Sequence, residues 1–273
     1  MDFGISTFVT DETPTPGEIG RMVEERGFDS LFVAEHLHMP RTTVRDVERK
    51  YYRSLDPFAT LTAAAATTSR LRLGFGILLL AQRDPITTAK AIASLDQVSG
   101  GRVEVGLGAG WNAPEIENHG TPFNQRFGVM RERVEAMKAI WTEDEASYHG
   151  RHVDFDNIFS WPKPVQKPHP PLWIGGTGEK VIERVLRYGD GWFPNTRDRL
   201  AERISDLRRR GEEAGRGRIP VTHFGTPIDA GVVEDLAEAG VDRVLFMVPS
   251  AGQAEMERAA DEAAAIAGRV GTP

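Results

Sequence analysis

Leu71-Arg-Leu-Gly-Phe-Gly-Ile-Leu-Leu-Leu80 is the segment from which the fold can be worked out, because a helix signal and a second apolar run come after it. Asp84-Pro85 comes next and is typical of a helix start, with Asp as the N-cap and Pro in the first turn. The segment Ile86–Val98 then has helical character, and Arg102–Leu107 is again short and apolar. Strands that alternate with helices in this way pair in parallel.

The same unit recurs along the whole chain. The apolar runs that we interpret as strands are Asp2–Phe8, Ser30–Ala34, Leu71–Leu78, Arg102–Leu107, Pro171–Ile174, Gly191–Pro194, Val221–Phe224 and Val241–Val248. Eight such units in a chain near ~250 residues predict an α/β fold of the (β/α)₈ TIM-barrel type. No linker rich in Gly, Ser or Pro interrupts the pattern, so residues 1–273 are predicted to form a single domain. Chemistry is then expected where the strands end, at the carboxyl face of the barrel.

The composition excludes several classes of function. The 273 residues carry 33 Lys and Arg against 40 Asp and Glu, a net charge of −7, which argues against nucleic acid as a partner. There is no cysteine, so disulfides, thiolate metal sites and thiol nucleophiles are absent. No apolar run approaches the ~18 residues that a membrane span needs. The first strand follows the initial Met directly, without a charged or apolar leader, so a cytoplasmic location is expected.

The second strand ends in Glu35-His36-Leu37-His38. An imidazole titrates near neutral pH and can donate or accept a proton during turnover. A histidine can also be a hydrogen-bonded structural residue, but the end of a barrel strand favours catalysis, with Glu35 beside His36. His36 and His38 also resemble a metal-binding pair. Because strand ends five and eight add no His or Asp and zinc needs three protein ligands or more, a metal site is not expected.

Two glycine-rich loops follow the fourth and fifth strands. The first is Gly106-Leu-Gly-Ala-Gly110-Trp111-Asn112, whose spacing differs from the dinucleotide-binding fingerprint. The second is Gly175-Gly176-Thr177-Gly178, which precedes a helix expected from Glu179. Backbone N–H groups at a helix N-terminus attract anions. The two loops together predict one phosphorylated ligand that spans them. Gly74 and Gly76 inside the third strand indicate a β-bulge, a close ligand or simple tolerance of glycine.

Three further segments carry expectations. Met39–Leu55 is longer than an ordinary loop, so we expect it to cover the pocket, with Tyr51, Tyr52 and Arg53 as candidate contacts or as plain surface. Residues 142–170 break the rhythm and predict a surface excursion with two short extended pieces around Gly150. An apolar stripe with helical spacing predicts a core-facing helix, and its members are Phe127, Met130, Val134, Met137 and Trp141.

Taken together, the motifs resemble the luciferase-like monooxygenase superfamily, in its deazaflavin-using branch, over nearly the whole chain. The segments that carry the resemblance are Gly27-Phe28-Asp29-Ser30-Leu31, Glu35-His36, Arg72-Leu-Gly-Phe-Gly-Ile-Leu, Leu95-Asp-Gln-Val-Ser-Gly-Gly-Arg102, Gly106-Leu-Gly-Ala-Gly-Trp111, Pro171-Leu-Trp-Ile-Gly-Gly176 and Gly189-Asp-Gly-Trp192.

The resemblance implies a barrel that binds coenzyme F420 or FMN at its carboxyl face. It implies a non-prolyl cis peptide at Gly76–Ile77 and a role for His36, with Glu35 beside it, next to the cofactor ring. Trp111 stands where members that dehydrogenate sugar phosphates carry Glu, which argues against such a substrate. The resemblance also implies a homo-oligomer. The cofactor contacts expected from it are Gly76, Ile77, Gly108, Ala109, Gly110, Trp111, Gly175, Gly176, Thr177 and Gly178.

The expected function is hydride transfer between F420 and a small organic substrate, with His36 moving a proton. An alternative is an FMN-dependent monooxygenase that uses O₂ and reduced FMN from a separate reductase. Two further hypotheses are a flavin-binding protein without catalysis and a metal-dependent hydrolase.

Overall fold

The computed structural model describes residues 1–270 and contains an eight-stranded parallel sheet. The strand order is β8-β7-β4-β3-β2-β1-β10-β9. The strands are β1 (Asp2–Thr7), β2 (Ser30–Val33), β3 (Arg72–Leu79), β4 (Val103–Gly108), β7 (Leu172–Gly175), β8 (Gly191–Phe193), β9 (Thr222–Thr226) and β10 (Arg243–Met247). All eight strands expected from the apolar runs are therefore confirmed.

The two ends of this sheet meet and complete the barrel. Trp192 and Val221 form a parallel bridge between the β8 and β9 segments. The Trp192 amide donates to the Pro220 carbonyl at 3.0 Å, and the Phe224 amide donates to the Pro194 carbonyl at 2.8 Å. Because all strands run the same way, their carboxyl ends lie on one face, which is where a TIM barrel carries its chemistry.

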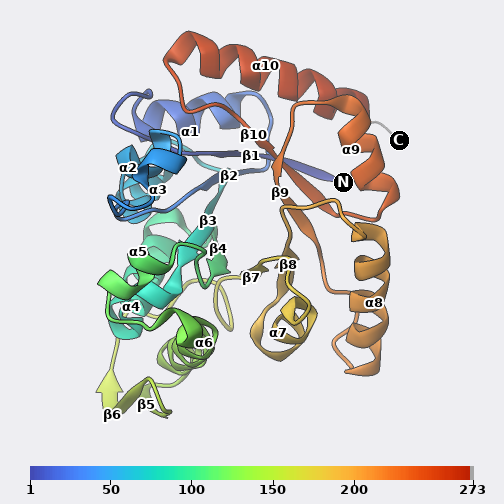
Figure 1. The fold of residues 1–273 in the computed structure, drawn as a ribbon. Helices are drawn as coiled ribbons and strands as arrows, with labels where there is room; N and C mark the ends of the chain where they lie inside the picture. The colour runs from blue at the N-terminus through green and yellow to red at the C-terminus, as the bar shows by residue number, and fades with distance from the viewer. Residues whose placement is uncertain (271–273) are drawn as a thin grey trace.

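Helices surround the sheet, as Figure 1 shows. Asp56 and Asp84 cap α3 and α4 by accepting hydrogen bonds from amides of the first turn, as the Asp-Pro pairs predicted. The α-helices are α1 (Pro16–Glu25), α2 (Lys50–Arg53), α3 (Pro57–Ala65), α4 (Pro85–Ser99), α5 (Ala113–Asn118), α6 (Arg126–Thr142), α7 (Val181–Tyr188), α8 (Leu200–Glu213), α9 (Ala230–Glu238) and α10 (Gln253–Val270). Short 3-10 turns are η1 (Val44–Asp46), η2 (Leu80–Gln82) and η3 (Phe123–Gln125).

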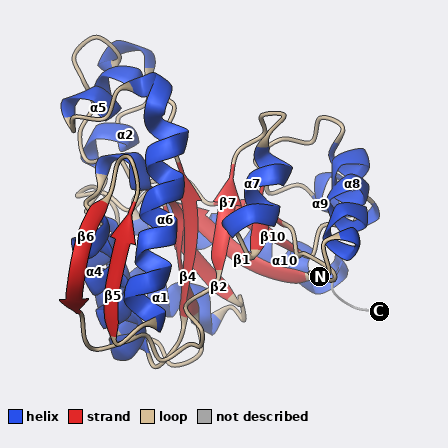
Figure 2. Ribbon diagram, turned by 90° about the horizontal axis from the view of Figure 1, so that it is seen from below, coloured by secondary structure: helices blue, strands red, loops and turns tan. Residues whose placement is uncertain are grey.

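The segment between α6 and β7 is a surface excursion, as expected. Its two strands, β5 (Glu145–His149) and β6 (Asp154–Phe159), form an antiparallel hairpin of their own. Figure 2 shows this hairpin beside α6 and outside the barrel strands.

Two helix predictions need correction. The helix expected from Glu179 begins at Val181, because residues 178–180 form a turn, closed by the Val181 amide donating to the Gly178 carbonyl at 3.0 Å.

The second correction concerns the apolar stripe of α6. Met130, Val134, Met137 and Trp141 are buried, as predicted for a core-facing helix. Phe127 is 37% exposed and lies in the first turn of α6. Helical spacing places a residue on a face of the helix, but the ring of Phe127 packs against the guanidinium groups of Arg126 and Arg184 instead of in the core.

A buried ion pair fills the amino-terminal part of the barrel interior. Arg243 on β10 donates to both carboxylate oxygens of Glu104 on β4, at 2.9 and 2.6 Å. The indole N–H of Trp173 donates to the same carboxylate at 2.6 Å, and Arg72 also contacts it. Burial alone would raise the pKa of Glu104, but the two guanidinium groups lower it to about 2.

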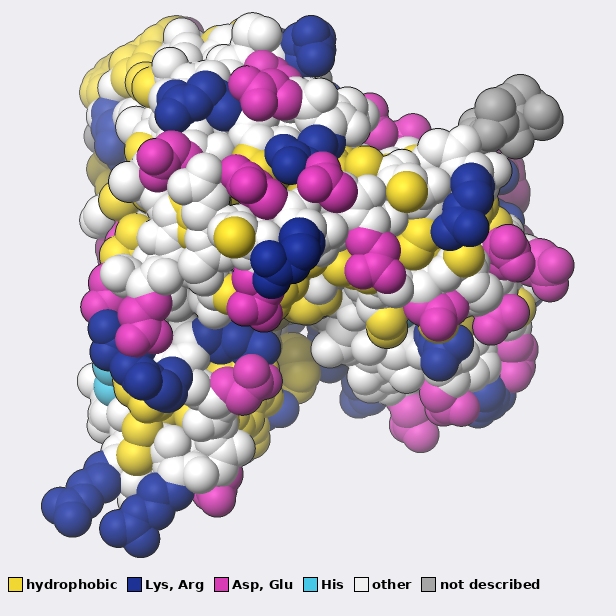
Figure 3. All heavy atoms as spheres, turned by 90° about the horizontal axis from the view of Figure 1, so that it is seen from above, with side chains coloured by type: hydrophobic (Ala, Val, Ile, Leu, Met, Phe, Trp, Pro, Cys, Tyr) yellow, Lys and Arg dark blue, Asp and Glu magenta, His cyan; other side chains and the backbone are white. Residues whose placement is uncertain are grey.

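Among residues 1–270, no helix combines the length and the apolarity that a membrane crossing requires. On the face in Figure 3, acidic and basic side chains are interspersed, and that face shows no broad basic area.

Candidate functional site

A cavity of about 540 Å³ opens at the carboxyl ends of the barrel strands. Each of the eight strands, or the loop that follows it, contributes to its lining, and α2 and α6 add Tyr51 and Phe127. Cofactor sites are typically concave and mostly apolar cavities of this size, with few polar groups. The cavity is therefore the candidate functional site.

Most of the site residues expected from the sequence lie on this cavity. Those in its lining are Glu35, His36, Gly76, Ile77, Gly108, Ala109, Gly110, Trp111, Gly175 and Gly176. Thr177 and Gly178 are not part of the lining. Their carbonyl oxygens accept hydrogen bonds from Arg203 at 2.7 and 3.1 Å, so this half of the loop is directed toward α8.

His36 is held by a carboxylate that the sequence motifs did not indicate. Its Nδ1 lies 2.9 and 3.1 Å from the two carboxylate oxygens of Glu115 on α5, and both side chains are buried. Among the residues that the structure describes, Nε2 of His36 has no hydrogen-bond partner. A carboxylate at Nδ1 favours the tautomer with the proton on Nδ1, which leaves Nε2 available as a proton acceptor.

Glu35 has a different environment from its neighbour. One carboxylate oxygen accepts from Nε of Arg83 at 2.6 Å, and the other accepts from the Leu79 amide at 2.6 Å. Arg83 also pairs with Asp56 at 3.0 Å. Burial raises the pKa of Glu35, and the charge of Arg83 opposes this rise. Because both oxygens are engaged, the contacts favour a positioning role for Glu35 over the catalytic role expected beside His36.

Glycines shape the floor of the cavity. The Gly76–Ile77 peptide bond is cis, as the resemblance implied. The Ile77 side chain lies over two glycines, and a Cβ atom on Gly108 would be 1.9 Å from its Cδ1, while one on Gly175 would be 3.4 Å from its Cγ2. Gly74 has another role, because a Cβ there would be 2.3 Å from the ring of Phe32. Gly74 thus permits core packing, whereas Gly108 and Gly175 keep the floor flat.

Two arginines flank an aromatic ring at the rim. The guanidinium carbons of Arg126 and Arg184 lie 4.4 and 3.8 Å from the centroid of Phe127. Nε of Arg126 donates to the Gly110 carbonyl at 3.2 Å, which joins this rim to the glycine loop after β4. Within residues 1–270, neither guanidinium has an ion-pair partner. The rim of the described structure therefore carries uncompensated positive charge. Burial and the charge of Arg184 lower the pKa of Arg126.

Comparison with known proteins agrees with this geometry. The family model described as luciferase-like monooxygenase matches residues 2–270. The chain belongs to this family. An uncharacterized protein of Mycobacterium tuberculosis is 40% identical over 285 residues, which cover 99% of this chain and 97% of that protein.

Two solved structures share the fold over at least 97% of the chain. A monooxygenase from Streptomyces bottropensis superposes with a TM-score of 0.85 at 20% identity, and all of both chains is covered. The coenzyme F420-dependent tetrahydromethanopterin reductase from Methanopyrus kandleri has a TM-score of 0.75 at 18% identity, with 97% of this chain and 98% of that chain covered. At these identities the likeness establishes the fold alone.

Several residues at this site were not predicted from the sequence, and Glu115, Arg184 and Phe127 are three of them. Glu115 follows Asn112-Ala-Pro114 at the start of a short helix, so a helix-start signal was present but pointed to no partner. Arg184 carried no signal beyond its charge. Phe127 was assigned to the core.

The three candidate contacts in Met39–Leu55 have different environments. Tyr51 lines the cavity, whereas Tyr52 is exposed and is absent from the lining. Arg53 pairs with Asp11 at 2.5 Å.

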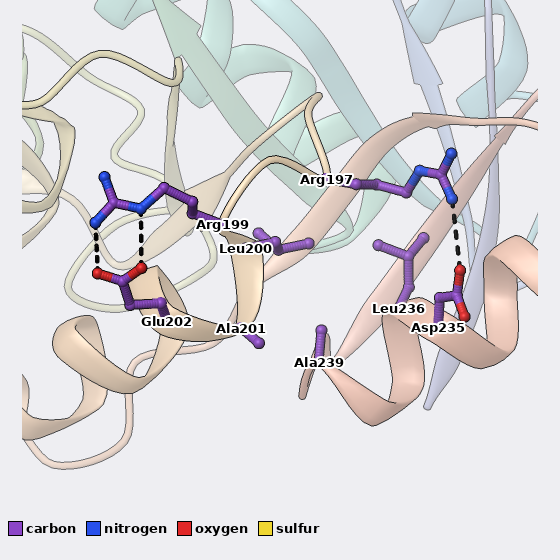
Figure 4. Close-up of a pocket in the computed structure, with 8 residues that line it drawn as sticks. All are labelled: Arg197, Arg199, Leu200, Ala201, Glu202, Asp235, Leu236 and Ala239. Atoms are coloured by element: carbon purple, nitrogen blue, oxygen red, sulfur yellow. Dashed lines mark hydrogen bonds and ion pairs between the residues drawn. The ribbon is translucent and has the colours of Figure 1, made fainter.

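A second cavity, of about 320 Å³, lies between α8 and α9. Figure 4 shows that its two arginines already face carboxylates: Arg199 pairs with Glu202 at 2.5 Å and Arg197 with Asp235 at 3.6 Å. Because both arginines already pair with carboxylates, they offer little net positive charge to an anionic ligand. We therefore place no ligand there.

Gly108→Ala is expected to weaken cofactor binding by about tenfold, because its methyl group displaces Cδ1 of Ile77 into the space above the floor. Ile77→Val removes that Cδ1 atom, so the double variant Gly108→Ala/Ile77→Val should recover most of the affinity. Equilibrium dialysis with FMN and with F420 provides the measurement. Gly252→Ala is the control for loss of a glycine, because a Cβ atom there meets no atom within 4 Å and the backbone is outside the left-handed region. Equal affinities of Gly108→Ala and wild type would contradict the role of the flat floor.

Proposed function

We propose that this luciferase-like protein transfers a hydride between the deazaflavin coenzyme F420 and a small organic substrate. The observation that carries this proposal is the state of His36. Its Nδ1 is held by Glu115, its Nε2 has no partner among the described residues, and the ring lines the cavity. Oxidation of an alcohol or reduction of a carbonyl needs such a proton-transfer group beside the carbon that exchanges the hydride.

The cavity fits a flat ring with an anionic tail. Gly76, Gly108 and Gly175 leave a floor without side chains of their own, over which Ile77 lies. Arg126 and Arg184, which have no ion-pair partner among residues 1–270, place positive charge at the rim, where a phosphate would be neutralised. A bound deazaflavin would accept or donate the hydride.

The residues of the chain would supply orientation and proton transfer. In the oxidising direction, a bound deazaflavin would take up the hydride of the substrate carbon, while the residues of the chain orient the alcohol and accept its proton. The hydroxyl proton moves to Nε2 of His36, and a C=O bond replaces the alcohol. Glu115 stabilises the imidazolium that results, because its carboxylate lies 2.9 Å from Nδ1. In the reducing direction the same proton returns to the carbonyl oxygen.

The second candidate is an FMN-dependent monooxygenase. The family description itself favours it, since the matching model is named for monooxygenases. It would require reduced FMN from a separate reductase and O₂ as the oxidant. The same floor and rim would hold FMN, so the two candidates differ in the ring and not in the cavity.

We expect the protein to bind F420 and, once the coenzyme is reduced, to oxidise it with a carbonyl substrate in the absence of O₂. Arg184→Ala should weaken binding of F420 and FMN by about 5- to 30-fold, because a charge-assisted contact to phosphate is lost. Riboflavin, which lacks the phosphate, should bind both forms equally. Arg187→Ala is the matched control, since Arg187 lies on the same helix and pairs with Glu135. Fluorescence quenching of the cofactors measures these affinities.

Tight FMN binding without any affinity for F420, together with O₂-dependent turnover, would replace the first candidate by the second. Binding of a cofactor without reduction of any acceptor would indicate a flavin-binding protein. A homo-oligomer, a separate reductase and a location in the cytoplasm remain predictions, and light scattering tests the first of them.

A further inference from the structure

Three aromatic side chains surround His36 at one side of the cavity. The Tyr51 ring is 5.1 Å from the imidazole centroid, the Trp111 ring 6.0 Å and the Phe8 ring 6.4 Å. Phe8 and Tyr51 also contact each other, with centroids 4.9 Å apart. We call Phe8, Tyr51 and Trp111 the aromatic subsite.

The aromatic subsite is distinct from the floor that the proposed cofactor would cover. The floor glycines belong to β3, β4 and β7. Phe8 follows β1, and Tyr51 lies on α2, which follows β2. In the order of the sheet, β2 and β1 come after β3, on the side away from β4 and β7. Trp111 joins the two regions, because it follows the glycines of the β4 loop.

This part of the cavity lacks a charge that could hold an anion. In the part of the chain that the structure describes, no lysine or arginine lines the cavity. The ionisable groups there are Glu35, which pairs with Arg83, His36, which pairs with Glu115, and the phenol of Tyr51. The ammonium of Lys50 lies 5.6 Å from the centroid of the Phe8 ring, but it already pairs with Glu48 at 2.9 Å. An anionic group placed beside His36 would lose its hydration without gaining a cationic partner.

Several contacts keep the aromatic subsite in place. The Leu55 amide donates to the Val9 carbonyl at 2.8 Å, which ties the Tyr51 segment to the end of β1. The hydroxyl of Ser54 donates to the backbone carbonyl of His36 at 3.0 Å. Trp111 is 54% exposed, so much of its indole surface is open for another flat group to cover.

We infer that the substrate is a neutral molecule with a flat aromatic or conjugated ring, which stacks on the exposed indole of Trp111 beside the ring of Tyr51, with its reacting oxygen toward His36. The identity of this ligand as substrate rests on the proposed function. The preference for a neutral flat ring over an anion rests only on the lining of the cavity.

Calorimetric titration of the protein, with and without F420, tests the inference with three probes of similar size. These are 2-naphthol, its saturated analogue decahydro-2-naphthol, and the anion 2-naphthoate. We expect 2-naphthol to bind at least tenfold more tightly than either of the others in both forms of the protein. Tyr51→Leu, which keeps an apolar side chain but removes the ring, should reduce the affinity for 2-naphthol by about tenfold. Tyr52→Leu is the matched control, because its exposed ring is outside the lining.

Equal or tighter binding of 2-naphthoate would overturn the inference, and so would equal binding of 2-naphthol by Tyr51→Leu and wild type. Circular dichroism and F420 affinity show whether Tyr51→Leu is folded, and Phe8→Leu is the second variant if it is not. Selective binding of 2-naphthol without any cofactor affinity would refute the proposed function and retain the aromatic subsite. Cofactor binding without this selectivity would retain the proposed function and refute the aromatic subsite.

Discussion

Arg243→Met is expected to lower the free energy of unfolding by about 3–5 kcal/mol, as measured by urea denaturation. The substitution leaves the carboxylate of Glu104 buried without its bidentate partner. It also removes the guanidinium from between the rings of Phe32 and Trp173, whose centroids lie 5.1 and 4.9 Å away. Because Arg72 still contacts Glu104, the decrease in the free energy of unfolding should lie near the lower end of this range.

The double variant Glu104→Gln/Arg243→Met should be more stable than Arg243→Met alone. The amide of Gln carries no charge that needs a partner, and its oxygen can still accept from the Trp173 indole. Arg26→Met is the control for loss of an arginine, since Arg26 pairs with the exposed Asp261. This substitution should lower the free energy of unfolding by at most about 1 kcal/mol. A double variant no more stable than Arg243→Met would contradict the role of the unpaired charge.

The same ion pair predicts part of the acid sensitivity of the protein. The pKa of Glu104 is lowered to about 2 in the folded state, below its ordinary value of 4.5. A lowered carboxyl pKa stabilises the folded state above the unfolded pKa, and this contribution is lost as the pH falls from about 4.5 toward 2. Unfolding measured across this range should be less steeply pH-dependent in the double variant than in the wild type.

His36→Gln is the second variant with a large expected effect, a fall in kcat of about 10²- to 10⁴-fold. Glutamine keeps a polar side chain at the cavity wall but cannot transfer the proton. Oxidation of reduced F420 with neutral aromatic ketones, followed by absorbance, provides the measurement. Cofactor affinity should change little, because the proposed cofactor contacts lie on the floor and the rim.

Glu115→Gln tests the partner of His36 and should give a smaller loss of kcat, since the amide no longer stabilises the imidazolium. His38→Gln is the matched control, because the imidazole of His38 bonds to Asn118 and is not part of the cavity lining. Full turnover by His36→Gln would remove the observation on which the proposed function depends.

The sequence was sufficient for the barrel because its signals are local. Each strand appears as a short apolar run, and Asp56-Pro57 and Asp84-Pro85 cap their helices within a few residues. In a parallel barrel all strands end on one face, so the order of elements already predicted that the loops with His36, Gly108 and Gly175 would meet. Ten of the twelve residues expected at the site accordingly line one cavity.

Only the tertiary structure decided which side chains pair across that cavity. Glu115 lies 79 residues from His36, and Arg83 lies 48 residues from Glu35. Such pairs depend on how separate loops are oriented, and no periodicity along the chain records that orientation. Phe127 shows the same limit, since its spacing matches the buried face of α6 while its position in the first turn exposes it at the rim. Local patterns determine which elements form, whereas side-chain partners follow from how the folded elements face one another.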